Sequence, residues 1–203
     1  MTTATMEYQE ALFGSAHAAL TFAFNFSGQA YDRPMMNRMA APSIGTGKGL
    51  SGLDGAAQAG MVRAELRALG PLYEACLIAK VAPQGIPCEC TRSCCSGTRA
   101  NPEWQEAIGT LTKISVAALA GCVSHYRLRQ GIIHRCFGEK TTLQALADLC
   151  DVSRDLANDH NAKVVTWLKG APTRRGQQPI VGVEQQAWEA IEMRLRDAGM
   201  VGA

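Results

Sequence analysis

Residues 142–157, TLQALADLCDVSRDLA, carry the pattern that decides the fold of this chain. Thr142 and Ser153 are residue types that cap the starts of helices, and each stands directly before a helix-forming stretch. Ala147 suits a close crossing of two helices, and Val152 is placed to fill the core of the turn between them. The first helix has three leucines at helical spacing on one face, Leu143, Leu146 and Leu149. The segment therefore predicts two helices joined by a short turn.

The second helix of this pair keeps an apolar face beyond the turn, formed by Leu156, Ala157, Val164, Val165 and Leu168. Residues 128–137 predict a preceding helix, which completes a three-helix unit within residues 124–170. A steep crossing of the last two helices is the arrangement that reads DNA. We therefore expect a helix-turn-helix with these DNA-facing side chains: Ser153, Arg154, Asn158, Asn161 and Lys163.

Charge in this region is mixed. The turn residue is Asp151, where glycine is favoured, and the carboxylates of Asp155 and Asp159 repel phosphate. A helical hairpin that only packs is therefore the alternative interpretation. The whole chain has 20 basic and 18 acidic residues, a net charge of +2, whereas residues 125–175 hold nine basic and five acidic residues, a surplus of four positive charges. This concentration of positive charge predicts a surface that faces a polyanion such as DNA.

Four cysteines crowd into the eight residues CECTRSCC, within a segment rich in Pro, Gly and Ser. A loop of this kind has no apolar core, and four thiolates around one Zn²⁺ would supply one. The predicted ligands of this structural zinc site are Cys88, Cys90, Cys94 and Cys95. Adjacent cysteines face one ion with difficulty, so a fourth ligand from Cys76, Cys122 or His125 is an alternative. A redox-active thiol cluster is a further alternative.

The rest of the chain has the composition of a helical globular protein, with 47% hydrophobic and 6% aromatic residues. The predicted fold class is all-α, a helical bundle with a cysteine-rich loop and a helix-turn-helix. Further helices are expected at residues 6–24, 56–69, 71–80, 103–122 and 184–198. The predicted regions are 1–70 with a flexible segment 27–55, 71–123 with helices bracketing the cysteine-rich loop 83–102, 124–170 with the helix-turn-helix, and 171–203 with a linker and the last helix. The remaining cysteines stand at core-like helical positions and are expected to be buried: Cys76, Cys122, Cys136 and Cys150.

Several classes of protein are disfavoured. Residues 11–26 are apolar, but they follow Glu7 and Glu10 and are interrupted by polar residues, so we expect neither a signal peptide nor a membrane span, and a cytoplasmic location. The glycine-rich stretch 44–49 lacks the spacing of a phosphate-binding loop. The four histidines have no partner at metal-binding or catalytic spacing, and we expect no enzymatic activity.

The helix-turn-helix spacing resembles region 4 of bacterial sigma factors, with a G-x-x-[ST] joint at residues 138–141, then L-x-x-L-A and V-S. Together with the helical first half and the cysteine loop, residues 50–170 resemble the late-gene antiterminators of lambda-like bacteriophages, the Q type. The resemblance implies that the cysteine cluster binds metal and that Thr142–Lys163 reads double-stranded DNA at a late promoter. It also implies that the protein loads onto host RNA polymerase in the host cytoplasm.

Other functions fit the same residues. A conventional phage repressor or activator would use the same helix-turn-helix, and a zinc-stabilised protein–protein adaptor would bind no DNA. A homodimer formed through the last helix is a further expectation, because dimers of this motif read palindromic sites.

Overall fold

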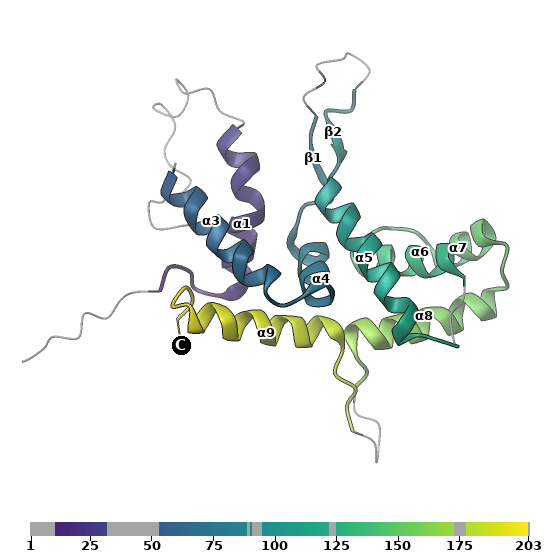
Figure 1. The fold of residues 1–203 in the computed structure, drawn as a ribbon. Helices are drawn as coiled ribbons and strands as arrows, with labels where there is room; N and C mark the ends of the chain where they lie inside the picture. Colours follow the sequence, from purple (N-terminus) through teal and green to yellow (C-terminus); the bar gives the residue numbers. More distant parts are fainter. Residues whose placement is uncertain are drawn as a thin grey trace, which may run out of the picture. The chain divides into compact units, whose positions relative to one another are not determined.

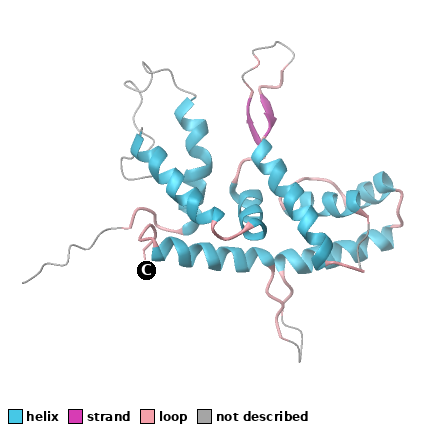
Figure 2. Cartoon of the chain, viewed as in Figure 1, coloured by secondary structure: helices cyan, strands magenta, loops and turns pink. Residues whose placement is uncertain are grey.

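The computed structural model describes residues 11–31, 53–88, 90, 95–121, 125–172 and 178–202 (Figure 1). Over these residues the chain is mostly helical, as expected, but it also contains one two-stranded antiparallel sheet that we did not predict (Figure 2). The elements are α1 (Ala16–Tyr31), α3 (Leu53–Arg67), α4 (Pro71–Val81), β1 (Gly85–Pro87), β2 (Thr98–Ala100), α5 (Pro102–Ala118), α6 (Tyr126–Cys136), α7 (Leu143–Cys150), α8 (Arg154–Lys169) and α9 (Val183–Asp197).

The chain divides into two compact units. One unit consists of Met1–Glu65 together with Ile191–Ala203, and the other of Leu66–Ala190. Helix α9 therefore contributes residues to both units. The cysteine cluster and the predicted helix-turn-helix both belong to the second unit.

In the first unit, helix α1 begins ten residues later than the sequence suggested. Residues 11–15 are not helical, because Ser15 starts the helix by accepting the N–H of Ala18 on its Oγ at 3.1 Å. Phe13 instead pairs with Val201, and its N–H donates to the carbonyl of Met200 at 2.9 Å. The helix then continues to Tyr31, so residues 27–31 of the expected flexible segment are helical.

The expected flexible segment 27–55 also overlaps the next helix at its other end. Helix α3 begins at Leu53, three residues before the predicted start, while residues 32–52 lie outside the described part of the chain. Met61 of α3 is 51% exposed. The stripe that α3 buries is Ala59, Val62 and Leu66, and a rotation of about 100° per residue turns Met61 away from it.

In the second unit, α4 and α5 pack together and are joined by the strand pair β1–β2. Cys76, Leu77, Ile108 and Leu111 are fully buried in these helices. The indole Nε1–H of Trp104 donates to the carbonyl of Ala79 at 3.0 Å and ties α5 to α4. Asn101 caps α5 by accepting the N–H of Glu103, and its amide donates to the carbonyl of Pro83 at 2.8 Å. Both ends of the segment 83–102 are thus fixed at the base of the hairpin.

Helix α6 packs against α5, α7 and α8. The two predicted caps are confirmed, because Thr142 accepts the N–H of Ala145 at 3.1 Å and Ser153 accepts the N–H of Leu156 at 3.2 Å. The buried side chains of this group are Leu128, Ile132, Ile133, Leu146, Ala147, Cys150, Ala157, Val164 and Leu168.

Two leucines assigned to the apolar faces are exposed instead. Leu149 of α7 is 74% exposed and Leu156 of α8 is 42% exposed. The buried stripe of α7 runs through Leu146, Ala147 and Cys150, which leaves Leu149 on its edge toward solvent. In α8 the stripe begins at Ala157 and continues through His160, a residue that the apolar pattern had skipped.

The turn between α7 and α8 contains the one residue other than glycine with a positive φ in the described part of the chain. Asp151 has φ 53° and ψ 47°, the left-handed conformation in which a side chain costs free energy. Replacing Asp151 by glycine is expected to raise the free energy of unfolding by up to about 1 kcal/mol. Urea unfolding followed by circular dichroism measures this change.

The control for this prediction is the same substitution at an exposed position inside a helix. Ala162→Gly in α8 is expected to lower the free energy of unfolding by about 1 kcal/mol. A decrease for Asp151→Gly as well would contradict the prediction, because the aspartate side chain would then contribute more than its backbone strain removes.

Helix α9 is anchored to α4 at its start. Lys80 forms an ion pair with Glu184 at 2.6 Å, and the hydroxyl of Tyr73 donates to Gln186 at 2.8 Å. Its apolar stripe, formed by Val183, Ala187, Ile191 and Leu195, is buried within the chain itself. The homodimer expected through the last helix stays a prediction.

Candidate functional site

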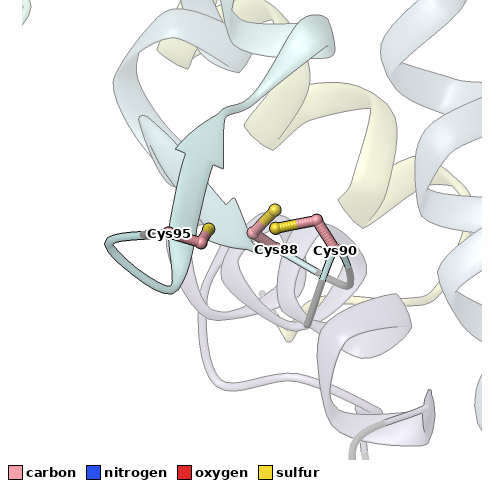
Figure 3. A group of neighbouring side chains, drawn as sticks. All are labelled: Cys88, Cys90 and Cys95. Carbon is pink, nitrogen blue, oxygen red and sulfur yellow. The ribbon is translucent and has the colours of Figure 1, made fainter. Parts of the chain in front are cut away.

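Three of the four predicted zinc ligands come together at the end of the β1–β2 hairpin. The Sγ atoms of Cys88, Cys90 and Cys95 all lie within 4.8 Å of one another (Figure 3). Strand β1 runs into Cys88, and Cys95 lies shortly before β2, so antiparallel pairing brings the two ends of the loop together. The N–H of Cys88 donates to the carbonyl of Gly97 at 2.9 Å and extends this pairing by one step.

The geometry of this cluster fits a thiolate-bound metal ion. Two sulfurs held at about 2.3 Å from a tetrahedral zinc lie about 3.8 Å apart, so the three thiols are close to the required separation without large movements of the backbone. Cys88 and Cys95 are half-buried and Cys90 is exposed, which leaves the cluster accessible to an ion from solvent. The three thiols thus form a candidate metal centre.

The thiols of this centre interact with one another. A hydrogen bond with the Cys90 thiol is the main cause that raises the pKa of Cys95, the backbone of Gly97 opposes the rise, and the Cys88 thiol adds to it. A metal ion binds the thiolate and must displace these protons. Binding of a metal ion by these thiols would therefore release protons and would be weaker at low pH.

Among the described residues, no fourth ligand joins the three thiols, so Cys94 or another group is the candidate for that position. Cys94 and Cys122 lie outside the described residues. Two suggested fourth ligands do not join the cluster. Cys76 is fully buried in α4, and burial raises its pKa to about 12. The Nδ1 of His125 accepts the N–H of Leu128 at 3.2 Å and caps α6.

The prediction that the isolated cysteines are buried is confirmed for Cys76 and Cys150 but is wrong for Cys136. Cys76 is fully buried and Cys150 is 8% exposed, whereas Cys136 is half-buried. Burial is also the main cause that raises the pKa of the Cys136 thiol. The raised pKa values keep the thiols of Cys76 and Cys136 protonated near neutral pH, so these two side chains contribute to packing rather than to a reactive site.

The predicted DNA-facing residues divide into two groups. Arg154, Asn158 and Lys163 are exposed on α8. Ser153 is exposed, but its hydroxyl is used in capping the helix. Asn161 is half-buried, and its Oδ1 accepts a hydrogen bond from the guanidinium of Arg135 at 3.2 Å. Sequence periodicity could not reveal this bond, because its partner lies on α6.

The positive surplus of residues 125–175 is only partly on the surface. The guanidinium of Arg129 is buried, and its Nε donates to the carbonyl of Thr112 at 3.3 Å. Arg174 and Arg175 lie outside the described residues. The exposed basic residues of this block in the described chain are Arg127, Lys140, Arg154, Lys163 and Lys169.

An apolar groove of about 600 Å³ lies beside the second half of α8, and we did not predict it from the sequence. Its walls come from α8, from the start of α9 and the residues just before it, and from α4 and the end of α5. Trp167 and Lys163 line it together with Ile180 and Val181, which are 56% and 44% exposed. The groove therefore places apolar side chains in contact with solvent.

His160 is the buried polar residue on the packed face of α8. It is 4% exposed, and its Nδ1 has no hydrogen-bond partner in the described part of the chain. Burial lowers the pKa of His160, and the nearby Lys163 lowers it further. The side chain is therefore neutral near neutral pH and belongs to the core, as is usual for a lone helical histidine.

Comparisons with protein families, with curated proteins and with solved structures gave no match to this chain. Among the described residues, no helix combines the length and the apolar character needed to cross a membrane.

Proposed function

We propose that this protein is a sequence-specific DNA-binding regulator of transcription, and that α7 and α8 act as its helix-turn-helix. One observation carries the proposal. Helices α7 and α8 are joined by only three residues, Asp151–Ser153, both helices begin at capped residues, and α8 exposes the face opposite its buried stripe. A helix held in this way can enter the major groove with its first two turns.

The cations on α8 are placed for contacts with phosphate. Arg154 stands at the start of the helix and Lys163 lies two and a half turns further along, and both are exposed. Each contact with phosphate releases a counterion, which makes affinity dependent on salt. Because Asp155 and Asp159 oppose this attraction, the protein needs base contacts as well as charge.

Removing Arg154 and Lys163 tests the DNA-binding proposal. In Arg154→Ala/Lys163→Ala, the slope of log affinity against log salt is expected to fall by about 1.8, since each lost phosphate contact contributes about 0.9. Titration of a labelled duplex at several salt concentrations measures the slope.

The control for this experiment removes two exposed cations from other helices, Arg67→Ala and Lys113→Ala. This pair is expected to leave the slope unchanged. Equal slopes for the wild type and Arg154→Ala/Lys163→Ala, or no salt-dependent binding at all, would contradict the proposal.

The cysteine hairpin is proposed to hold one Zn²⁺ as a structural site, with Cys94 as the fourth ligand beside Cys88, Cys90 and Cys95. The support is the donor set, because several thiolate ligands are typical of structural zinc and three Sγ atoms lie within 4.8 Å of one another. The hairpin has few buried side chains of its own. A metal would therefore stabilise a segment that side-chain packing does not.

The finer part of the proposal is that the regulator acts as a late-gene antiterminator of a bacteriophage and modifies host RNA polymerase. The support is the resemblance of residues 50–170. Transcription in vitro across a terminator, with and without the protein, tests it. Increased read-through that needs upstream promoter DNA is expected, whereas a change in initiation alone would leave a conventional repressor or activator.

A second candidate function is a zinc-stabilised protein–protein adaptor, which the apolar groove beside α8 favours. Ile180 and Val181 expose apolar surface in this groove, which a bound partner would cover. An adaptor would bind no DNA even at low salt. The duplex titration described above therefore also separates these two functions.

A further inference from the structure

The centre of the exposed face of α8 is acidic. The stripe that α8 buries is Ala157, His160, Val164 and Leu168. At about 100° per residue, the positions that lie most nearly opposite this stripe in the first two turns are Asp155 and Asp159. Both are exposed, while Arg154 and Asn158 lie to one side of them. If α8 enters the major groove, its aspartates point at the bases and its cations lie toward the groove walls.

No single structural role in the described part of the chain accounts for both carboxylates. Neither aspartate forms an ion pair or a side-chain hydrogen bond with a described residue. Asp155 stands in the first turn, where a negative charge stabilises the helix dipole. Asp159 lies beyond the first turn, so the dipole does not account for it.

The chemistry of the major groove gives both carboxylates a partner. An ionised carboxylate only accepts hydrogen bonds, and cytosine presents an amino group that donates there. Guanine presents two acceptors, and thymine presents an acceptor and a methyl group, so both repel or exclude a carboxylate. An asparagine side chain bonds adenine through two hydrogen bonds. The residue types on this face therefore select particular bases rather than phosphate.

Resting on the proposed DNA-binding function, we propose that Asp155 and Asp159 each accept a hydrogen bond from the amino group of a cytosine, and that Asn158 bonds an adenine between or beside them. Four helical residues rise about 6 Å, which is close to two base-pair steps of about 3.4 Å. The two cytosines are therefore expected about two base pairs apart. The negative charge of the aspartates weakens binding to every DNA sequence, and their hydrogen bonds strengthen binding only at a site with these cytosines. Specificity therefore rises while affinity in general falls.

Selection of duplexes from a randomised library by the full-length, zinc-loaded protein tests this inference. The wild type is expected to enrich a half-site with cytosines at a fixed spacing. In Asp159→Asn, the preference for cytosine at one position is expected to be lost, and in Asp155→Asn at the other. For a single duplex pair with cytosine replaced by thymine, the wild-type affinity ratio of tenfold to about a hundredfold should fall to about one in the matching variant.

Asp148→Asn is the matched control, because Asp148 is an exposed acid on α7 rather than α8. It removes the same charge and is expected to leave the selected bases unchanged. If both α8 variants raise affinity equally for all duplexes without changing the selected bases, the aspartates face phosphate and the inference is overturned. If the wild type enriches no sequence and binds no DNA, the proposed function itself fails, which is a separate result.

Discussion

Replacing Cys95 by serine is expected to reduce zinc affinity by at least about a hundredfold. The free energy of zinc binding in structural sites is about 10–16 kcal/mol, so one of four thiolates contributes about 3 kcal/mol, and 1.4 kcal/mol is a tenfold change. The Sγ of Cys95 lies within 4.8 Å of two other thiols, and serine cannot replace it as a soft ligand. Competition with a chromophoric chelator measures the affinity, and elemental analysis measures the zinc content.

The matched control for this prediction is Ser96→Ala, in the same loop. Ser96 donates a hydrogen bond to the carbonyl of Thr98 at 3.2 Å and has no ligand atom in the cluster. It is expected to keep one zinc per chain. Full zinc content in Cys95→Ser, or no zinc in the wild type after loading, would contradict the metal site.

The helices should survive the loss of zinc. The side chains that hold α4 against α5, such as Leu77, Ile108 and Trp104, are buried independently of the hairpin tip. Far-ultraviolet circular dichroism of Cys95→Ser is therefore expected to match that of the wild type. The loss of metal would then be separated from a failure of the whole chain to fold.

Replacing Gly182 by alanine is expected to destabilise the second unit by about 3 kcal/mol or more, since overpacking alone costs about 1–3 kcal/mol and backbone atoms cannot rotate away. A Cβ at Gly182 would overlap backbone atoms of Leu168, Lys169 and Gly170. The N–H of Ala171 and the carbonyl of Ile180 are hydrogen-bonded at 3.0 Å, which holds the two backbones together. Thermal unfolding measures the loss.

Gly109→Ala is the control for Gly182→Ala. Gly109 lies inside α5, and a Cβ there meets nothing within 4 Å. The substitution is expected to stabilise the protein by about 1 kcal/mol, because alanine is the better helix former. The two glycine-to-alanine substitutions should thus have opposite signs. A small effect at Gly182 would show that the contact between the two segments relaxes easily.

Features that depend on neighbouring residues could be predicted from the sequence. Thr142 and Ser153 cap the expected helices because a capping hydroxyl bonds a backbone N–H only three residues away. Breaker residues excluded a helix from the segment 83–102, and the crowding of cysteines there indicated a metal site. The buried stripes of α7 and α8 were predicted only in part. Periodicity gives the spacing of the residues in a stripe, but it does not determine which residues at its margins are buried.

Other features were decided only by the tertiary structure, because they depend on residues that are distant in sequence. The β1–β2 pairing needs contacts across the whole cysteine loop, and the residue types in the strands do not predict it, because β1 contains Gly85 and Pro87 and β2 ends at Ala100. The exposure of Leu149 and Leu156 depends on where neighbouring helices end their contact. The bond from Arg135 to Asn161 and the close approach of Gly170 and Gly182 join different elements. Local sequence thus determined where α7 and α8 begin and which residues carry chemistry, whereas packing between distant segments determined which of those residues face solvent.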